Sequence, residues 1–458
     1  MALGARSLRP RLALAPHGVV LSGVVLHCVV IIGVVLLGGA PPLAAADGLT
    51  IVAERTLLPD GTLAEGLAVV IDDEGRIARV IAVAGKELPE PVRRFGAGSV
   101  LAPGLHELLS ALGAPGEREE SVRTFDAAAD AAQAIDPLRR DLDRARRAGI
   151  LVATVAPAPR NPVSGIAATF LTGARPELAR IGGAAAPLLI AVGESALDPL
   201  REPTSRSGLR RALEEWLAGP GARALEGRAA PLVHCGEAMD VRAAIELFPR
   251  GAVPTLVLST GIRECAEILA RASPERRPAI VVVGPYGPGS APAELAGAAH
   301  LARAGVEIAL SGAFPAAGDD ALRDAARRAV GHGLDPAAAR RAITANPARA
   351  VGLAAEIGSI APKRRADLVI FSGDPLLAGS AVVALWQGGV EIPVPAALPD
   401  PAGRGARPEI PEIPVIPEIP ESPVPPASTE MPEKTEQTVG PDAAGSPPRP
   451  AMMRAGPR

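Results

Sequence analysis

Residues 231–283 read PLVHCGEAMDVRAAIELFPRGAVPTLVLSTGIRECAEILARASPERRPAIVVV. This stretch alternates short apolar runs with longer segments rich in Ala, Arg, Glu and Leu. The apolar runs are Pro231–His234, Thr255–Leu258 and Ile280–Val283, and the segments between them include Val241–Phe248 and Ile262–Arg271. Strands that are apolar on both faces are typical of a parallel sheet covered by helices on either side. The stretch therefore predicts three parallel strands joined by two helices.

The same alternation extends on both sides of this stretch. Further strand-like runs are Ile150–Val155, Ala167–Leu171, Leu188–Val192 and Val306–Leu310, and further helical segments are Leu138–Ala148 and Leu209–Leu217. With the run that opens at Val100–Leu105, eight strands fall within roughly 250 residues, which fits a closed (β/α)8 barrel. The predicted fold class is therefore α/β, with a TIM barrel as its main body.

Strand patterns of a different kind flank the predicted barrel. Residues 49–102 contain short β-rich runs separated by turns, and the β pattern returns at Asp367–Phe371 and Ala381–Trp386. We expect strands from both ends to pair in one small β-sandwich, into which the barrel is inserted. The predicted organisation is a leader at residues 1–46, sandwich strands at 47–102, the barrel at 103–359, further sandwich strands at 360–395, and a tail at 396–458.

The leader has the pattern of an export signal. Arginines at positions 6, 9 and 11 precede an apolar run at residues 19–37, and Ala44-Ala45-Ala46 offers a small-residue cleavage site. The run is close to the ~20 residues that span a bilayer, so a retained membrane anchor through residues 19–37 is the alternative to cleavage. Both interpretations predict a periplasmic or otherwise extracytoplasmic protein, either secreted or membrane-anchored.

The far end of the chain has a different composition. From about Pro393 the sequence is rich in Pro and Glu, and residues 408–414 read PEIPEIP. Prolines at this density remove backbone donors and favour extended polyproline II. We therefore predict that residues 396–458 form a disordered, Pro-rich tail.

Charge and cysteine content bear on partners and on cross-links. The formal net charge is −3, which provides no basic surface field for nucleic acid. Three cysteines cannot form a disulfide framework, and whether Cys235 and Cys265 pair depends on the fold. We expect no nucleic-acid partner. The expected partner is a small molecule or a protein that the sequence does not name.

Several segments resemble the amidohydrolase superfamily. Residues 66–77 are similar to the family's sandwich hairpin, and residues 100–105 are similar to its entry into the first barrel strand. Residues 343–349 and 357–360 resemble its closing helix and turn, and residues 366–375 resemble the sandwich strand that follows. Within the barrel, residues 203–208 and Val233-His234 with Asp240 resemble the imidazolonepropionase-like branch. The resemblance covers about residues 49–391, and it implies a barrel inserted into a small sandwich.

The resemblance also implies a metal-dependent hydrolase site at the C-terminal ends of the barrel strands. Active members hydrolyse C–N or similar bonds with a metal-bound hydroxide, while an Asp transfers protons. The family places a His-x-His pair after strand one, His residues after strands five and six, and an Asp after strand eight. The corresponding positions in this chain are Leu108 and Ser110, His234, Ser259 with Thr260, and Ser311. Some members add a carboxylated Lys, whereas residues 103–359 contain no Lys.

Two histidines are the candidate metal ligands. His234 stands at the predicted end of strand five, where it is a metal ligand, a buried polar remnant or a donor in a binding pocket. His106 has no second His two residues away, so the alternatives to metal ligation are an ordinary turn position or a place behind the ligands, in contact with them. Arg206, Glu237 and Asp240 are the candidate binding residues, and the alternative for the Arg-rich segment around Arg206 is a solvated start of a helix. No catalytic residue is assigned.

These residue types predict a non-catalytic homologue. One or two isolated imidazoles do not make a zinc site, which needs three or four donors. We therefore expect an exported amidohydrolase-family protein with a binding or scaffold role and no cofactor. The alternative is an active amidohydrolase that acts on non-peptide C–N bonds. It would hold zinc or another divalent metal in an atypical centre built from His234, Glu237, Asp240 or His106.

Overall fold

The computed structural model describes residues 48–396, apart from residues 115, 117, 119, 121, 174–178, 249–253, 287–289 and 317. The predictions for the leader at residues 1–46 and for the tail beyond Ala396 therefore lie outside the described residues. Within the described part, no helix combines the length and the apolar character that crossing a bilayer requires.

The two ends of the described chain form two β-sheets. The first sheet has the order β5-β4-β1-β6, and the second has the order β20-β19-β18-β7-β2-β3. Their strands are β1 (Thr50–Val52), β2 (Arg55–Leu57), β3 (Leu63–Glu65), β4 (Leu67–Ile71), β5 (Ile77–Ala82), β6 (Val92–Arg94), β7 (Val100–Pro103), β18 (Leu368–Phe371), β19 (Val382–Gln387) and β20 (Val390–Ile392). β18 runs antiparallel to β7, with Leu368 opposite Pro103 and Phe371 opposite Val100. Strands from the two ends of the sequence thus pair directly.

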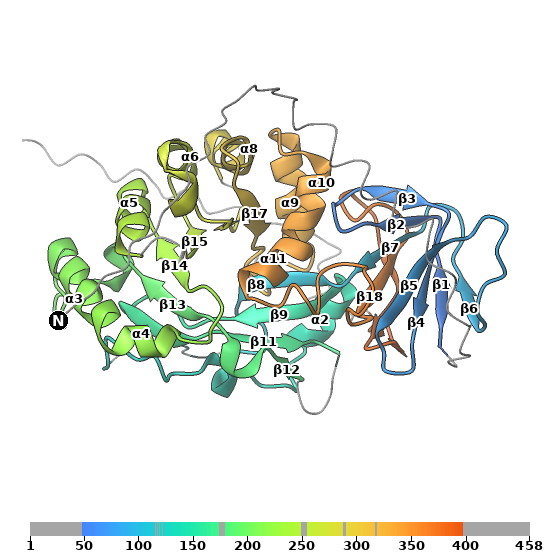
Figure 1. Ribbon diagram of the computed structural model, residues 1–458, viewed down its shortest axis with the longest axis horizontal. Helices are drawn as coiled ribbons and strands as arrows, with labels where there is room; N and C mark the ends of the chain where they lie inside the picture. Colours follow the sequence, from blue (N-terminus) through green and yellow to red (C-terminus); the bar gives the residue numbers. More distant parts are fainter. Residues whose placement is uncertain are drawn as a thin grey trace, which may run out of the picture. The chain divides into compact units, whose positions relative to one another are not determined.

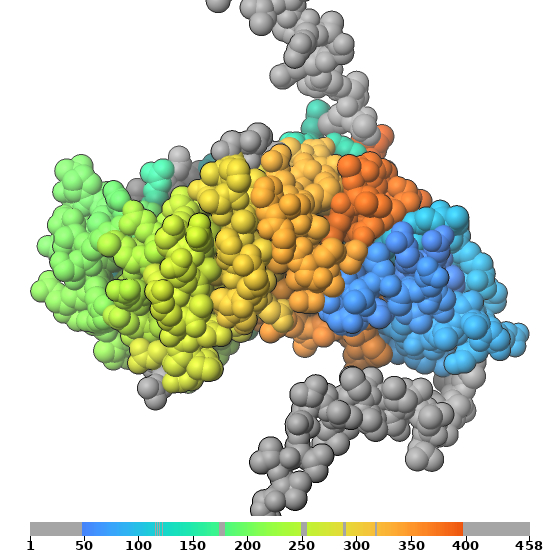
Figure 2. All heavy atoms as spheres, turned by 90° about the horizontal axis from the view of Figure 1, so that it is seen from above, coloured from blue at the N-terminus to red at the C-terminus, as the bar shows by residue number. Residues whose placement is uncertain are grey.

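One apolar core joins these two sheets. Ile51 and Val69 of the first sheet are fully buried in the same cluster as Leu368, Ile370 and Trp386 of the second. Figure 2 shows the C-terminal strands, in orange-red, beside the N-terminal strands, in blue. Burial of each such side chain contributes about 1.5–3 kcal/mol, so neither sheet is expected to persist without the other.

Five parallel strands form most of the central sheet. They are β13 (Leu188–Ala191), β14 (Leu232–Cys235), β15 (Thr255–Leu258), β16 (Ile280–Val283) and β17 (Glu307–Leu310), each paired with the next. The helices between them are α3 (Arg206–Ala218), α4 (Pro220–Leu225), α5 (Ala238–Leu247), α6 (Ile262–Arg271), α7 (Pro292–Leu295) and α8 (Gly297–Arg303). Figure 1 shows α5, α6 and α8 along one side of these strands. Val241 and Leu269 of the helices share a core with Val233 and Leu256 of the strands. This part of the fold has the parallel, helix-covered arrangement that residues 231–283 predict.

A second, shorter sheet precedes it in the chain. Its order is β12-β11-β9-β8, and its strands are β8 (Leu105–Ser110), β9 (Ile150–Val155), β11 (Ala168–Leu171) and β12 (Arg180–Ile181). β8 and β9 are parallel, but β11 is antiparallel to β9. The remaining strand, β10 (Val163–Ile166), is antiparallel to β13 at the edge of the central sheet. The prediction of eight parallel strands in one closed barrel is therefore wrong for the described residues, whose strands form two separate sheets.

The short connection after β9 explains this difference. A parallel partner requires a crossover connection of a dozen or more residues, usually with a helix in it. Residues 156–162 read APAPRNP, and their three prolines prevent a helix. The chain therefore continues as the strands β10 and β11. The run at Ala167–Leu171 is a strand, as predicted, but its direction is reversed.

The described residues contain four further α-helices and four short 3-10 helical turns. They are α2 (Asp141–Arg147), α9 (Ala321–Gly331), α10 (Pro336–Ala342) and α11 (Ala345–Ala350), with single turns η1 (Ala131–Ala134), η2 (Gly183–Ala185), η3 (Glu194–Ala196) and η4 (Pro274–Arg276). The backbone N–H of His106 donates to the Ile343 carbonyl at 3.0 Å, and the side-chain amide of Asn346 donates to the Ile308 carbonyl at 2.8 Å. The segment around α10 and α11 is therefore bonded to both β8 and β17.

Candidate functional site

A cavity of about 270 Å³ lies at the C-terminal ends of the strands. Its walls are mostly apolar and include Leu189, Val257 and Val282 from three strands of the central sheet. Residues 156–159, which follow β9, also line it. We call this space the central cavity. Ligands of α/β proteins bind at this end of the strands, where the connecting loops converge.

Among the described residues, four polar side chains line the central cavity, and three of them stand at strand ends. His234 is near the end of β14, Ser259 follows β15, and Ser311 follows β17, whereas Arg118 comes from the segment after β8. The strands are packed closely here. Gly284, which follows β16, has φ +123°, and a Cβ atom on it would lie 2.5 Å from the Ser311 carbonyl oxygen. Only glycine permits this approach of the two backbones.

His234 is a half-buried imidazole at the edge of the cavity. Its Nδ1 atom lies 3.2 Å from the hydroxyl of Ser195 in η3, which follows β13. Burial lowers the pKa of His234, and the nearby charge of Asp240 opposes this shift. The ring is therefore neutral at pH 7, and its Nε2 atom makes no hydrogen bond to any of the described residues. It can donate to, or accept from, a molecule in the cavity.

Arg118 supplies a positive charge to the same space. Its Nη1 atom donates to the carbonyls of Ser110 at 3.0 Å and Ala156 at 3.2 Å, so the side chain bridges the end of β8 and the segment after β9. No carboxylate among the described residues forms an ion pair with it. Arg118 was not among the predicted site residues, because nothing in the sequence indicates that this loop residue reaches the cavity.

His106 is enclosed in the core and is not among the residues that line the cavity. It is completely buried, and its Nε2 atom lies 2.8 Å from the Thr154 hydroxyl, which in turn lies 2.9 Å from the Thr169 hydroxyl. Burial lowers the pKa of His106 to about 3. The ring is therefore neutral, and its contacts join β8, β9 and β11.

Glu107, the next residue along β8, is a buried acid that the sequence analysis missed. It is completely buried, and its Oε1 atom accepts hydrogen bonds from the Gly312 N–H at 2.9 Å and the Ser311 hydroxyl at 3.2 Å. Burial raises the pKa of Glu107 to about 8, although these hydrogen bonds act in the opposite direction. At pH 7 the side chain is mostly a neutral carboxylic acid. The signal in the sequence was a Glu among the leucines at the end of the predicted first barrel strand.

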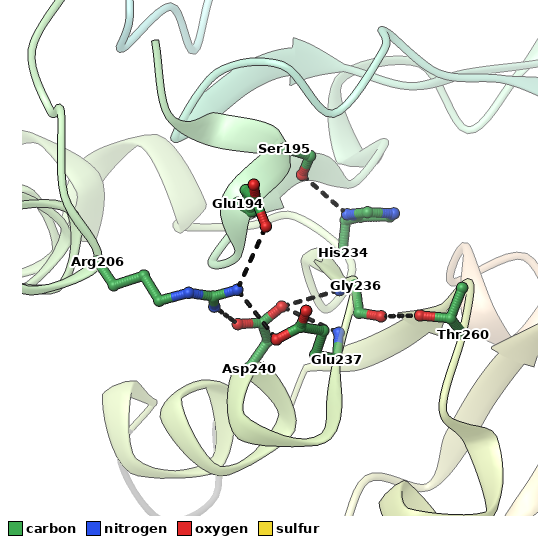
Figure 3. A network of polar contacts seen from close by, with 8 residues as sticks. All are labelled: Glu194, Ser195, Arg206, His234, Gly236, Glu237, Asp240 and Thr260. Atoms are coloured by element: carbon green, nitrogen blue, oxygen red, sulfur yellow. Dashed lines mark hydrogen bonds and ion pairs between the residues drawn. The ribbon is translucent and has the colours of Figure 1, made fainter. Parts of the chain in front are cut away.

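The candidate binding residues Arg206, Glu237 and Asp240 form one network beside His234 (Figure 3). Arg206, the first residue of α3, donates to Asp240 and to Glu237, the latter at 3.1 Å. The other carboxylate oxygen of Asp240 accepts the N–H groups of Gly236 and Glu237, both at 3.0 Å. Asp240 is only 2% exposed, whereas the Glu237 side chain is 55% exposed. Both oxygens of Asp240 are thus engaged by the start of α5 and by Arg206.

The network connects three loops at one end of the central sheet. Glu194, in the turn after β13, lies 4.0 Å from the Arg206 guanidinium. The Thr260 hydroxyl, after β15, donates to the Gly236 carbonyl (Figure 3). The predicted site residues His234, Arg206, Glu237 and Asp240 are therefore neighbours, and His106 is separate from them. Cys235 and Cys265 are both buried free thiols.

The residues that could ligate a metal are dispersed. Among the described residues, no group of three or more His, Cys, Asp or Glu side chains is arranged to hold an ion. Of the described residues that line the cavity, those with potential ligating side-chain atoms are one imidazole and two hydroxyls, and Arg118 adds a positive charge that opposes a cation.

Comparisons with known proteins agree with the resemblance in the sequence. The model of the amidohydrolase family matches residues 265–396. An amidohydrolase from Thermotoga maritima MSB8 has a similar structure, with 22% sequence identity, a TM-score of 0.62, and coverage of 75% of this chain and 99% of that chain. Molinate hydrolase is also similar, with 18% identity, a TM-score of 0.50, and coverage of 78% and 99%. No curated protein matches the chain in sequence.

These comparisons define the class of the fold. The chain has a mixed α/β fold similar to that of the amidohydrolase superfamily, and residues 265–396 match the sequence model of the amidohydrolase family. The predicted resemblance to this superfamily is confirmed. At these identities the solved structures establish similarity of fold, and the chemistry has to be argued from the residues of the cavity.

Proposed function

We propose that this chain is an exported, non-catalytic member of the amidohydrolase superfamily, which binds a small, largely apolar anion in the central cavity. The observation that carries the proposal is the lining of that cavity. In the part of the chain that the structure describes, apolar walls surround one cation, Arg118, one neutral imidazole and two hydroxyls.

The side chains at the strand ends do not fit the metal centre of an active amidohydrolase. A hydrolytic zinc ion requires three protein ligands with nitrogen, sulfur or carboxylate donors, and an open position for water. Among the described residues that line the cavity, His234 is the one such donor, and Ser259 and Ser311 offer neutral hydroxyls. His106 is bonded to Thr154 inside the core. We therefore derive no hydrolytic step from these residues.

Arg118 favours an anionic ligand. A guanidinium that borders an apolar cavity and forms no ion pair with a carboxylate of the described residues is poorly compensated, so a bound anion would gain a charge-assisted hydrogen bond there. The two Nη1 contacts to backbone carbonyls hold the side chain in place before a ligand binds. The apolar walls favour a compact hydrocarbon group, and His234, Ser259 and Ser311 provide further polar contacts.

The location of the protein is part of this proposal. The Arg-rich start, the apolar run at residues 19–37 and the alanines before Asp47 support export, with cleavage or with retention of an anchor. An extracytoplasmic protein with such a cavity would act as a receptor or carrier for a small molecule.

Calorimetric titration of the purified chain tests ligand binding. The probes are benzoate, cyclohexanecarboxylate and hexanoate, each compared with its neutral amide. We expect saturable binding of at least one carboxylate, and binding of its amide weaker by roughly tenfold or more, because a hydrogen bond to a charged group contributes about 1.5–3 kcal/mol.

Two variants identify the site. Arg118→Gln should abolish the preference for the carboxylate over the amide. Arg123→Gln, an exposed arginine of the same segment, serves as the matched control and should behave like the wild type. Absence of binding by all three carboxylates, or binding that Arg118→Gln leaves unchanged, would overturn the proposal.

A further inference from the structure

One row of side chains crosses the central sheet at the level of His234. The strand register pairs His234 of β14 with Val257 of β15, and Val257 with Val282 of β16. Paired residues of neighbouring strands point to the same face of a sheet, and all three side chains line the central cavity. The row therefore leads from one imidazole across two valines, which form an apolar floor on the way to β17.

A second row lies two residues further along the same strands. It consists of Ser259 after β15, Gly284 after β16 and Ser311 after β17, and all three line the cavity. Gly284 has no side chain, so nothing projects from β16 into the space beyond Val282. Polar side chains therefore stand on either side of β16, and the middle of the sheet offers apolar surface alone among the described residues.

The positive charge of the cavity lies on the side opposite His234. Arg118 donates to the carbonyls of Ser110, the last residue of β8, and of Ala156, which follows β9. The Ala111 N–H donates to the Phe314 carbonyl at 3.2 Å, so the end of β8 is next to the segment after β17. Neighbouring strands are about 4.8 Å apart, so β14 and β17 are separated by about 14 Å along the sheet.

The ring of His234 presents an unused hydrogen-bonding atom to the cavity. Its Nδ1 atom lies 3.2 Å from the hydroxyl of Ser195, which is not among the residues that line the cavity. The ring extends away from Arg206 and Asp240 (Figure 3), and its Nε2 atom has no hydrogen-bond partner among the described residues. The Ser259 hydroxyl, on the neighbouring strand, makes no hydrogen bond to the described residues either.

A ligand that is apolar at this end would leave these atoms unpaired. Filling the cavity displaces the water around Nε2, and a buried polar atom without a partner bears the full cost of its desolvation. A ligand group that donates to Nε2, or accepts from it, removes this cost. An uncharged group fits best, because His234, whose pKa burial lowers, is uncharged at pH 7. Among the described residues that line the cavity, the one charged side chain is Arg118, at the opposite end.

We propose that the ligand of the central cavity is bifunctional, with a carboxylate at Arg118 and an uncharged hydroxyl or carbonyl group at His234 and Ser259. A short apolar segment joins the two groups and lies over Val257 and Val282. The inference rests on the proposed function, because the carboxylate is the anion that Arg118 is proposed to bind. Hydroxy acids and oxo acids whose second oxygen is remote from the carboxylate have this chemistry.

Calorimetric titration of the full chain at pH 8 with pairs of positional isomers tests the inference. The pairs are 6-hydroxyhexanoate with 2-hydroxyhexanoate, and trans-4-hydroxycyclohexanecarboxylate with trans-2-hydroxycyclohexanecarboxylate. The members of a pair have the same charge and composition and differ in how far the hydroxyl is from the carboxylate. In at least one pair we expect the isomer with the remote hydroxyl to bind about fivefold more tightly or better, which is the net effect of one hydrogen bond.

A variant of His234 locates the effect. His234→Phe removes both ring nitrogens and keeps a ring of similar size, so it should bring the two isomers to equal affinity. His332→Phe is the matched control, because His332 is an exposed histidine at the end of α9 that does not line the cavity. It should keep the isomer preference of the wild type.

A second variant keeps the test decisive if His234→Phe does not fold. Ser259 is exposed, and Ser259→Ala should lower the isomer preference by about twofold or more, because one of the two partners of the remote hydroxyl is lost. Equal affinities of the isomers in both pairs, or a preference that persists in these variants, would overturn the inference and leave the proposed function intact. Failure of the plain carboxylates to bind would instead overturn the proposed function, on which the inference rests.

Discussion

Arg206 donates a hydrogen bond to one carboxylate oxygen of Asp240, while the other oxygen accepts the N–H groups of Gly236 and Glu237. The pair thereby fixes the turn that follows His234. Breaking a buried ion pair at one partner costs about 3–5 kcal/mol, and the partial exposure of Arg206 reduces this cost. We expect Asp240→Asn to lower the free energy of unfolding by about 2 kcal/mol in a denaturant titration.

Glu237→Gln is the matched control for this change. Glu237 contacts the same guanidinium, but its side chain is 55% exposed. The loss should be about 0.5 kcal/mol or less. Equal losses in the two variants would show that Asp240 is not the residue that stabilises this turn.

The second prediction concerns acid stability. Burial lowers the pKa of His106 from 6.5 to about 3, so the unfolded chain binds one more proton than the folded chain between these values. Stability from the neutral ring is present above the ordinary pKa and is lost as the pH falls towards 3. We expect His106→Gln, which can still bond to Thr154, to reduce the slope of unfolding free energy against pH by about 1.4 kcal/mol per pH unit in this range. An unchanged slope would place the acid sensitivity in other groups.

The third prediction concerns the backbone at the end of β16. Gly284 has φ +123°, and an added Cβ atom would lie 2.5 Å from the Ser311 carbonyl oxygen. Gly284→Ala should therefore destabilise the protein by about 2 kcal/mol or more, since it adds a steric clash to the conformational cost. Gly85→Ala is the control, because Gly85 has φ +68° and no atom within 4 Å of the added Cβ. It should cost about 1 kcal/mol. Similar thermal shifts for both variants would mean that the strands can separate at Ser311 without loss.

The fourth prediction concerns export. Cleavage after Ala46 would give a mature chain that begins at Asp47. Sequencing the N-terminus of protein from its native host should find this residue. An intact Met1 in the membrane fraction would establish the anchor instead, and a soluble cytoplasmic protein with Met1 would contradict both forms of the proposal.

The sequence predicted the regular part of the fold more closely than the irregular part. The bounds of β15 and β16 coincide with the predicted runs, because apolar strands between helical segments leave few alternatives. At Ala168–Leu171 the strand was predicted, but its direction relative to its neighbour was predicted wrongly. An apolar run has the same pattern in a parallel and an antiparallel strand, and the prolines at positions 157, 159 and 162 were the available signal.

The site was predicted in part for a similar reason. His234 lines the cavity. Its position could be predicted, because the strand pattern places it near the end of a strand. Arg206, Glu237 and Asp240, which were predicted as binding residues, form one network in the structure. Arg118 and Glu107 were missed, because their roles depend on contacts with Ala156 and Gly312, which are distant in the chain.

The metal content of the purified mature chain tests the central claim most directly. The cavity presents His234, Ser259 and Ser311 where an active amidohydrolase requires several ligands, and one imidazole does not retain zinc against a chelator. We predict substoichiometric divalent metal by elemental analysis, and no change in melting temperature when a chelator is added. Near-stoichiometric zinc that the chelator removes, and that His234→Ala fails to bind, would contradict the account and establish an atypical hydrolase centre.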